Sequence, residues 1–252
     1  MLRTLSLGFA LSAALAGSVS AETVDEVLAK NYEARGGLEK LKAVSSMRLT
    51  GKIGIGPGME APATLEMKRP SRMRLDLTFQ GLTATQAYDG KGGWQIMPFQ
   101  GNPNPEPLSP DDLQQAEEQA DMDGPLVDYK AKGHTVELVG KEKIEGTDAY
   151  KLKVTLKNGS VQTVFLDADS CLEIKGEAKR TIRGTEVETE QTIGDYKEVE
   201  GLLIPHSFES GPKGRPERQK MTIEKVELNV SIEDGRFAMP AAKAAAPAPP
   251  KN

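Results

Sequence analysis

Few side chains in this sequence have the types and spacing that catalysis or metal binding requires. The two histidines, His134 and His206, lie far apart within predicted strands, and each is more typical of a structural or surface residue. Asp167 and Asp169 could pair two carboxylates, but their spacing favours a solvated turn between strands. No HExxH, CxxC or GxSxG motif occurs. We therefore predict that the protein is not an enzyme and has no metal and no cofactor.

Two further features argue against nucleotide and nucleic-acid binding. The run GKIGIGPG at residues 51–58 superficially resembles a phosphate-binding loop, but it lies between predicted strands and no helix follows it. Its glycines more naturally shape a hairpin. The formal net charge is −5, and the basic residues are scattered among acidic ones. A nucleic-acid partner is therefore not expected.

Arg69 is the one charged residue whose position in the pattern is anomalous. Leu65 and Met67 alternate along a predicted strand, and the same period places Arg69 on their apolar face. In one interpretation the strand ends before Arg69, and Pro70 lets the guanidinium turn to solvent. In the other, Arg69 stands at the rim of an apolar concavity, where its donors need carbonyl or carboxylate partners. The pattern alone leaves both interpretations open.

The N-terminus predicts export. Residues 1–21 combine an early cation, Arg3, with a short apolar run and small residues before Glu22, which is the pattern of a cleaved signal peptide. The run is too short to span a membrane as a helix. A lipoprotein signal would carry cysteine where Ser18 stands, so we expect a soluble periplasmic protein without a lipid anchor. Cys171 is the only cysteine and cannot form an internal disulfide.

The mature chain is predicted to be one domain, residues 22–240, followed by a disordered Ala/Pro-rich tail at 241–252. Alternation of apolar and polar residues predicts long antiparallel strands with one apolar face, as in RMRLDLTF at 72–79. Helices are expected near 23–35, briefly at 38–44, and from a Ser-Pro-Asp-Asp start at 109–112. The fold class is therefore mainly β: a strongly curved sheet covered by two or three short helices.

The segment YDGKGGWQIMPF at 88–99 holds the only tryptophan. Asp89-Gly90 is a hairpin signal, so Trp94 should open a strand. Four features together resemble the outer-membrane lipoprotein carrier family, LolA and its relatives. They are Lys68-Arg69-Pro70, this hairpin with its Lys91, the tryptophan Trp94, and the Pro98-Phe99 pair. The segment from 106 to 132 and the tail have no counterpart in that resemblance.

The resemblance implies an incomplete antiparallel β-barrel, closed by helices over an apolar cavity that shields the acyl chains of a lipoprotein crossing the periplasm. By the same resemblance, Arg69 matches an arginine that holds the lid helices closed by hydrogen bonding to their backbone. We expect a cavity wall made of Leu65, Met67, Met73, Leu75, Leu77, Phe79, Trp94, Ile96 and Phe99.

The sequence thus predicts a monomeric periplasmic carrier that transfers lipoproteins or another lipid noncovalently, between an inner-membrane donor and an outer-membrane acceptor. A stress sensor or scaffold of the same fold is the alternative, and an enzyme reusing the fold is a weaker one. An empty apolar cavity of several hundred cubic ångströms would favour the carrier, and a core filled by its own side chains would favour the sensor or scaffold.

Overall fold

The computed structural model describes residues 22–182 and 185–241. The predicted signal peptide at 1–21 and nearly all of the predicted tail, from residue 242, lie outside the described residues. The elements are α1 (Val24–Ala34), α2 (Leu38–Ala43), β1 (Ser46–Gly56), β2 (Met59–Lys68), β3 (Arg72–Phe79), β4 (Leu82–Tyr88), β5 (Gly93–Met97), η1 (Pro98–Gln100), β6 (Asn102–Pro107), α3 (Pro110–Gln119), β7 (Thr135–Ile144), β8 (Thr147–Thr155), β9 (Val161–Asp167), β10 (Glu173–Ile182), β11 (Thr185–Val199), β12 (Leu202–Pro212), β13 (Gln219–Leu228) and η2 (Asp234–Arg236).

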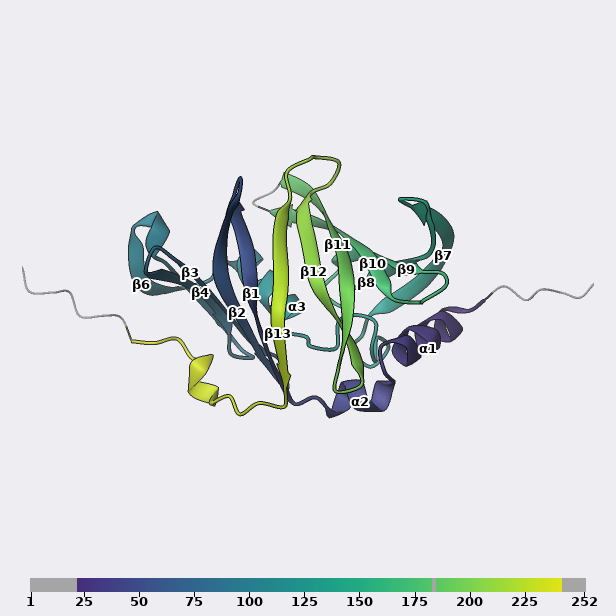
Figure 1. The fold of residues 1–252 in the computed structure, drawn as a ribbon, viewed down its shortest axis with the longest axis horizontal. Coiled ribbons are helices and arrows are strands. Elements are labelled where there is room, and N and C mark those ends of the chain that lie inside the picture. Colours follow the sequence, from purple (N-terminus) through teal and green to yellow (C-terminus); the bar gives the residue numbers. More distant parts are fainter. Residues whose placement is uncertain (1–21, 183–184, 242–252) are drawn as a thin grey trace, which may run out of the picture.

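The strands form one strongly curved antiparallel sheet (Figure 1). The strand order is β6-β5-β4-β3-β2-β1-β13-β12-β11-β10-β9-β8-β7, so two meanders meet where β1 pairs with β13. Within the described residues, β6 and β7 are the two edges and do not pair with each other. The predicted fold class, an incomplete antiparallel barrel with short helices, is confirmed.

This strand order determines where α3 must lie. The chain leaves the sheet at one edge, β6, and enters it again at the opposite edge, β7. The connection, α3 and residues 120–134, therefore crosses the inner face, which we define as the face that carries Leu65, Met73 and Phe208. Figure 1 accordingly shows α3 near the middle of the sheet rather than beyond its edges.

The helices begin where the sequence predicts. Thr23 caps α1 in a capping box with Glu26, and the hydroxyl of Ser109 accepts a hydrogen bond from the Asp112 amide at the start of α3. Pro110 occupies the first turn of α3, where no intrahelical donor is lost. The helix has a single buried residue, Ala116, so little apolar burial holds it in place.

Two apolar clusters fill parts of the inner face. Under α1, side chains of β8 and β9 such as Leu152, Val154 and Leu166 are completely buried with Val27 of the helix. Each such side chain contributes roughly 1.5–3 kcal/mol through removal from water. The second cluster lies under α3 and contains Met73, Tyr88, Leu108, Ala116 and Ala120.

The C-terminal segment after β13 crosses the outer face of β1–β5. Phe237 is 0% exposed there, and its carbonyl accepts a 2.7 Å hydrogen bond from Nε1 of Trp94. Arg236 donates to the buried carboxylate of Glu66 at 2.9 Å, and Glu66 also accepts from Arg48. We call residues 230–237 the C-terminal strap. It covers the side of the sheet opposite to α3.

Candidate functional site

Six of the nine residues predicted to form the cavity wall share the inner face. In the β2–β3 pair, Leu65 is opposite Leu75 and Met67 is opposite Met73. Leu77 and Phe79 continue the same face along β3. Phe99, in η1, packs against the edge of the Phe79 ring at a centroid distance of 6.3 Å and is 45% exposed.

Trp94 and Ile96 do not belong to this wall, and the expectation that they do is wrong. Trp94 pairs with Ala87 and Ile96 with Thr85, whereas the inner-face residue Met73 pairs with Tyr88. Successive strand residues alternate between faces, so Trp94 and Ile96 are on the outer face. Trp94 is only 2% exposed because the C-terminal strap covers it.

Helix α3 covers much of the predicted wall. Met73 is buried together with Ala116 and Ala120 of the helix, and Leu65 and Leu75 pack against the same cluster. Leu113 and Leu108 fill the space above Gly93 so closely that a Cβ there would lie 2.5 Å from Leu108. This half of the inner face is therefore filled by the protein's own side chains.

The open space lies on the other side of α3, over β9–β13. A groove of about 1660 Å³ runs from the β1–β2 hairpin to the loop that follows α3. Part of its lining is apolar, and most of these apolar side chains are half-buried. The half-buried ones are Ile55, Pro125, Ala178, Val187, Ile193 and Phe208; Val164 is buried, and Met59 and Pro212 are exposed at the rim.

Strand register explains why these apolar residues gather. Ile193 of β11 is opposite Phe208 of β12, Phe208 is opposite Met221 of β13, and Met221 is opposite Ile53 of β1. The row crosses four neighbouring strands on the inner face. No sequence pattern predicts this row, because β11 reads TEVETEQTIGDYKEV, in which Ile193 is an isolated apolar residue among polar and charged ones.

Polar side chains line the rest of the groove. Gln115 and Gln119 of α3, Gln162 of β9 and Gln191 of β11 are among them. A lipid bound here would contact an apolar floor and an amide-rich side wall. The groove is thus suited to an amphipathic ligand rather than to a pure hydrocarbon.

Arg69 makes four hydrogen bonds that join β2 to two of the helical segments. Its Nε donates to the Val44 carbonyl at 2.6 Å, and its Nη2 donates to the Leu41 carbonyl at 3.2 Å. The two terminal nitrogens also bind Asp123 in a bidentate ion pair, with both distances 2.6 Å. The strand ends at Lys68, as one interpretation supposed, and Arg69 nevertheless has the carbonyl and carboxylate partners that the other one requires.

The Arg69–Asp123 pair connects α2 to the loop after α3. Burial pushes the pKa of Asp123 up, but the hydrogen bonds from Arg69 outweigh it and leave that pKa below its usual range. The hydrogen bonds to Asp123 raise the pKa of Arg69. Both groups are therefore charged at neutral pH, and the planar guanidinium suits this bidentate contact.

A second polar attachment holds the other side of α3, and the sequence analysis did not identify it. Glu118 accepts a hydrogen bond from Arg180 of β10 at 2.7 Å and another from Asn158 at 3.0 Å. Ser160 donates to the same carboxylate at 3.3 Å. No local motif marks Glu118, because its partners lie 40 or more residues away.

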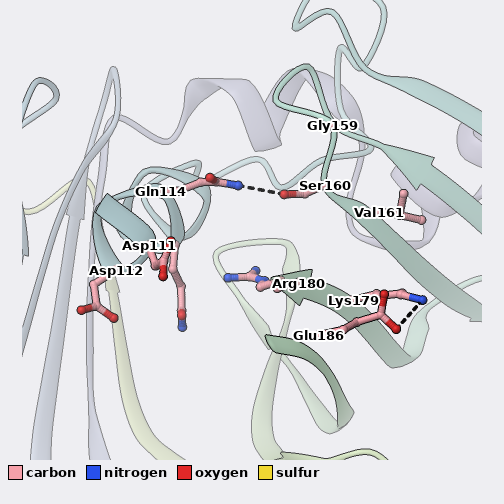
Figure 2. A pocket seen from close by; sticks show the side chains of 10 residues that line it. Asp111, Asp112, Gln114, Gly159, Ser160, Val161, Lys179, Arg180 and Glu186 are labelled. Carbon is pink, nitrogen blue, oxygen red and sulfur yellow. Dashed lines mark hydrogen bonds and ion pairs between the residues drawn. The ribbon is translucent and has the colours of Figure 1, made fainter. Parts of the chain in front are cut away.

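A smaller pocket of about 390 Å³ lies beside this attachment, between α3, the start of β9, and residues of β10 and β11. Figure 2 shows Gln114 pointing across it to Ser160, at 2.9 Å, and Lys179 paired with Glu186. Most of the side chains that line it are polar or charged, and its volume is less than a quarter of that of the groove, so it suits an acyl chain less well.

The residues considered for catalysis have structural contacts. Nδ1 of His134 accepts from the Lys157 amide at 3.1 Å, and Nδ1 of His206 lies 2.9 Å from the Ile204 carbonyl. Asp167 accepts from the amides of Asp169 and Ser170, which confirms the predicted turn. Within residues 22–182 and 185–241, no group of three or more His, Cys, Asp or Glu side chains could hold a metal ion.

Comparison with solved structures shows the fold. A LolA superfamily protein from Nitrosomonas europaea superposes with a TM-score of 0.59 at 15% identity, covering 86% of this chain and 98% of that one. An outer membrane lipoprotein-sorting protein domain from Vibrio parahaemolyticus gives 0.58 at 12% identity, covering 85% and 97%. A DUF1329 family protein from Desulfovibrio piger gives 0.55 at 12%, covering 86% and 98%.

No family model matches the chain, and no curated protein is significantly similar to it. The structural similarity nevertheless extends over nearly the whole of each solved chain. The protein therefore has the LolA-like fold. In the part of the chain that the structure describes, no helix is long and apolar enough to cross a membrane.

Proposed function

We propose that this protein is a periplasmic carrier that binds the acyl chains of a lipoprotein, or of another lipid, and transfers them noncovalently toward the outer membrane. The observation that carries the proposal is the open groove of about 1660 Å³ with a half-buried apolar floor. Pockets for small ligands typically measure about 300–1,000 Å³, so this one has room for more than one extended chain.

Burial of acyl chains supplies the driving force for binding. Each methylene that leaves water for the floor formed by Ile193, Phe208 and their neighbours gains roughly 0.8 kcal/mol. A chain of many methylenes therefore binds without any covalent step. Release requires a competing apolar surface or a change in the groove itself.

Helix α3 is suited to such a change. It contributes one buried residue, and polar contacts hold both of its sides: Glu118 with Arg180, and Asp123 of the following loop with Arg69. Polar contacts can be exchanged for hydrogen bonds with water when the helix moves, whereas an apolar interface has no such replacement. We propose that α3 and its loop act as a lid, with Arg69 as a latch.

The proposed location rests on the sequence and on the structural neighbours. The predicted signal peptide, the absence of a lipidation cysteine at Ser18, and the structural similarity to a lipoprotein-sorting domain support a location in the periplasm. We also propose that the protein is a monomer. We propose an inner-membrane donor and an outer-membrane acceptor. The proposal contains no catalytic step.

A matched pair of isoleucines tests the groove. Ile193 and Ile96 are both half-buried strand residues, but Ile193 lines the groove and Ile96 lies on the outer face. An uncharged pyrene-labelled diacylglycerol should bind the wild type and Ile96→Glu equally well. Ile193→Glu should weaken binding at least tenfold, because an inserted charge must lose water when the chain enters. Equal binding by all three folded proteins would contradict the proposed site.

A sensor or scaffold remains the second candidate. The observation that favours it is the filled half of the inner face, where α3 packs on Met73 and Tyr88. In that case the wild type would fail to bind the diacylglycerol probe.

A further inference from the structure

Glu173 is an unusual carboxyl group in the lining of the groove. It begins β10 and pairs with Leu166 of β9, so it lies on the inner face with Val164. Gly176 is the next groove-lining residue of β10. A carboxyl oxygen of Glu173 lies 3.5 Å from the position that a Cβ atom on Gly176 would take. The carboxyl group is therefore beside the floor on which the proposed ligand lies.

The carboxyl group of Glu173 has no hydrogen bond or ion pair to any described residue, in contrast to the other acidic side chains around it. The backbone carbonyl of Glu173 accepts from the Tyr196 hydroxyl at 2.8 Å, but that contact leaves the carboxyl free. The nearby acids are engaged with cations: Glu118 with Arg180, Asp121 with Lys132, Asp123 with Arg69, Glu177 with Lys213, and Glu190 with Lys175.

The charged and titratable groups that act on the Glu173 carboxyl are few. From the end of α1, Arg35 favours the ionised form, and from β11 the Tyr196 hydroxyl lies close by. Burial dominates over Arg35 and raises the pKa of Glu173 to about 7. The group therefore exchanges its proton near neutral pH.

We propose that Glu173 determines which ligands the groove accepts: its protonated carboxyl donates a hydrogen bond to a carbonyl oxygen of the bound acyl ester or amide. This inference rests on the proposed function. A carbonyl oxygen can only accept hydrogen bonds, and the same is true of an ionised carboxylate. No hydrogen bond can therefore form between the two. The protonated carboxyl supplies the missing donor. The ligand class is thus an ester- or amide-linked acyl chain rather than a plain hydrocarbon.

The proposal requires that affinity depend on pH. The ligand binds the protonated form, so binding is strongest below the pKa of the free protein and weakens as pH rises through it. For a group that titrates near 7, linkage gives an increase in Kd of about tenfold between pH 6 and pH 8. Glu177→Gln is the matched control, since Glu177 is on the same strand but its ion pairs with Lys213 and Lys175 help hold its pKa below the usual range.

The test measures Kd from pH 5.5 to 8.5 for an uncharged pyrene-labelled fatty acid methyl ester, which has no hydrogen-bond donor, and for a pyrene-labelled alkane without a carbonyl. We expect the wild type and Glu177→Gln to lose about tenfold in affinity for the ester between pH 6 and 8. Glu173→Gln keeps a donor and cannot titrate, so its Kd should be low and flat. Glu173→Leu should bind the ester about two- to tenfold more weakly at pH 6 and bind the alkane normally.

Two results would overturn the inference without touching the proposed function: binding of the ester that does not change with pH in the wild type, or a pH profile that survives in Glu173→Gln. Glu173→Gln retains both histidines. A pH dependence of Kd that survives in this variant would therefore come from a group other than Glu173. If the wild type binds neither probe at any pH, the proposed function fails and the inference fails with it.

Discussion

Replacing Arg69 by leucine tests whether this residue holds the helical segments against the sheet. The substitution keeps most of the bulk and removes the four donors that reach Leu41, Val44 and Asp123. It also leaves the Asp123 carboxylate, which is 12% exposed, without its cation. A buried charge that loses its partner costs about 3–5 kcal/mol, and the 30% exposure of Arg69 lowers this figure. We expect the free energy of unfolding to fall by about 2–4 kcal/mol.

Urea unfolding of a double-mutant cycle isolates the ion pair. Arg69→Leu, Asp123→Asn and the double variant should give a coupling energy of about 1.5–3 kcal/mol. Arg69→Lys should recover less than half of the loss, because an ammonium group cannot reach a carboxylate and two carbonyls at once. Since the pKa of Asp123 is lowered by Arg69, this stabilisation is complete above pH 4 and is lost as pH falls through the lowered pKa.

Function provides the second readout for the same variants. If Arg69 closes the lid, folded Arg69→Leu should bind the acyl probe but pass it poorly to acceptor vesicles. The reason is that the lid of this variant stays open both with and without bound probe, so closure no longer helps to expel the probe. A coupling energy below about 0.5 kcal/mol, together with wild-type binding and transfer, would refute the latch and reduce the pair to a surface contact.

Three further predictions concern the outer face and the two ends of the chain. Phe237→Ala should shift Trp94 emission to the red, whereas the acyl probe should leave it unchanged, since Trp94 lies under the C-terminal strap and outside the groove; an emission change on probe binding alone would contradict this placement. Deleting residues 241–252 should leave the melting temperature within about 2 °C of the wild-type value. Deleting everything from residue 230 should lower it by about 8 °C or more, at about 4 °C per kcal/mol, because Ile232 and Phe237 are buried. Equal effects of the two deletions would show that the tail docks. Intact mass of the exported protein should correspond to a chain that starts at Glu22, and a diacylglyceryl adduct or a retained Met1 would exclude the predicted processing.

The architecture could be predicted because alternation and caps are local signals. Period-two patterns identify β3 and β8, and the Ser109-Pro110 start identifies α3, without knowledge of what they pack against. The placement of Trp94 could not be predicted in this way. Alternation says which residues share a face, but not which face of a strand meets the helices, and the strap that covers Trp94 comes from the other end of the chain.

The sequence predicts an apolar cavity wall mainly on β2 and β3, whereas the open groove of the structure lies over β9–β13. The strongest apolar alternation lies in β2 and β3, and for that reason α3 packs there and fills the space. The open part lies over β9–β12, where apolar residues such as Ile193 and Phe208 are isolated in polar strands and meet only through register. Glu118 and Glu173 were missed because burial and distant partners, rather than any sequence motif, set their roles.

The most direct test of the central claim is to ask what the groove holds in the cell. The wild type and the Ile193→Glu and Ile96→Glu variants would be purified from the native envelope without detergent and measured by native mass spectrometry, followed by lipid extraction. The carrier proposal predicts about one acyl-bearing molecule on the wild type and on Ile96→Glu, and its loss from Ile193→Glu. Recovery of all three proteins at their bare mass, or equal lipid on all three, would contradict a lipid-binding groove over β9–β13.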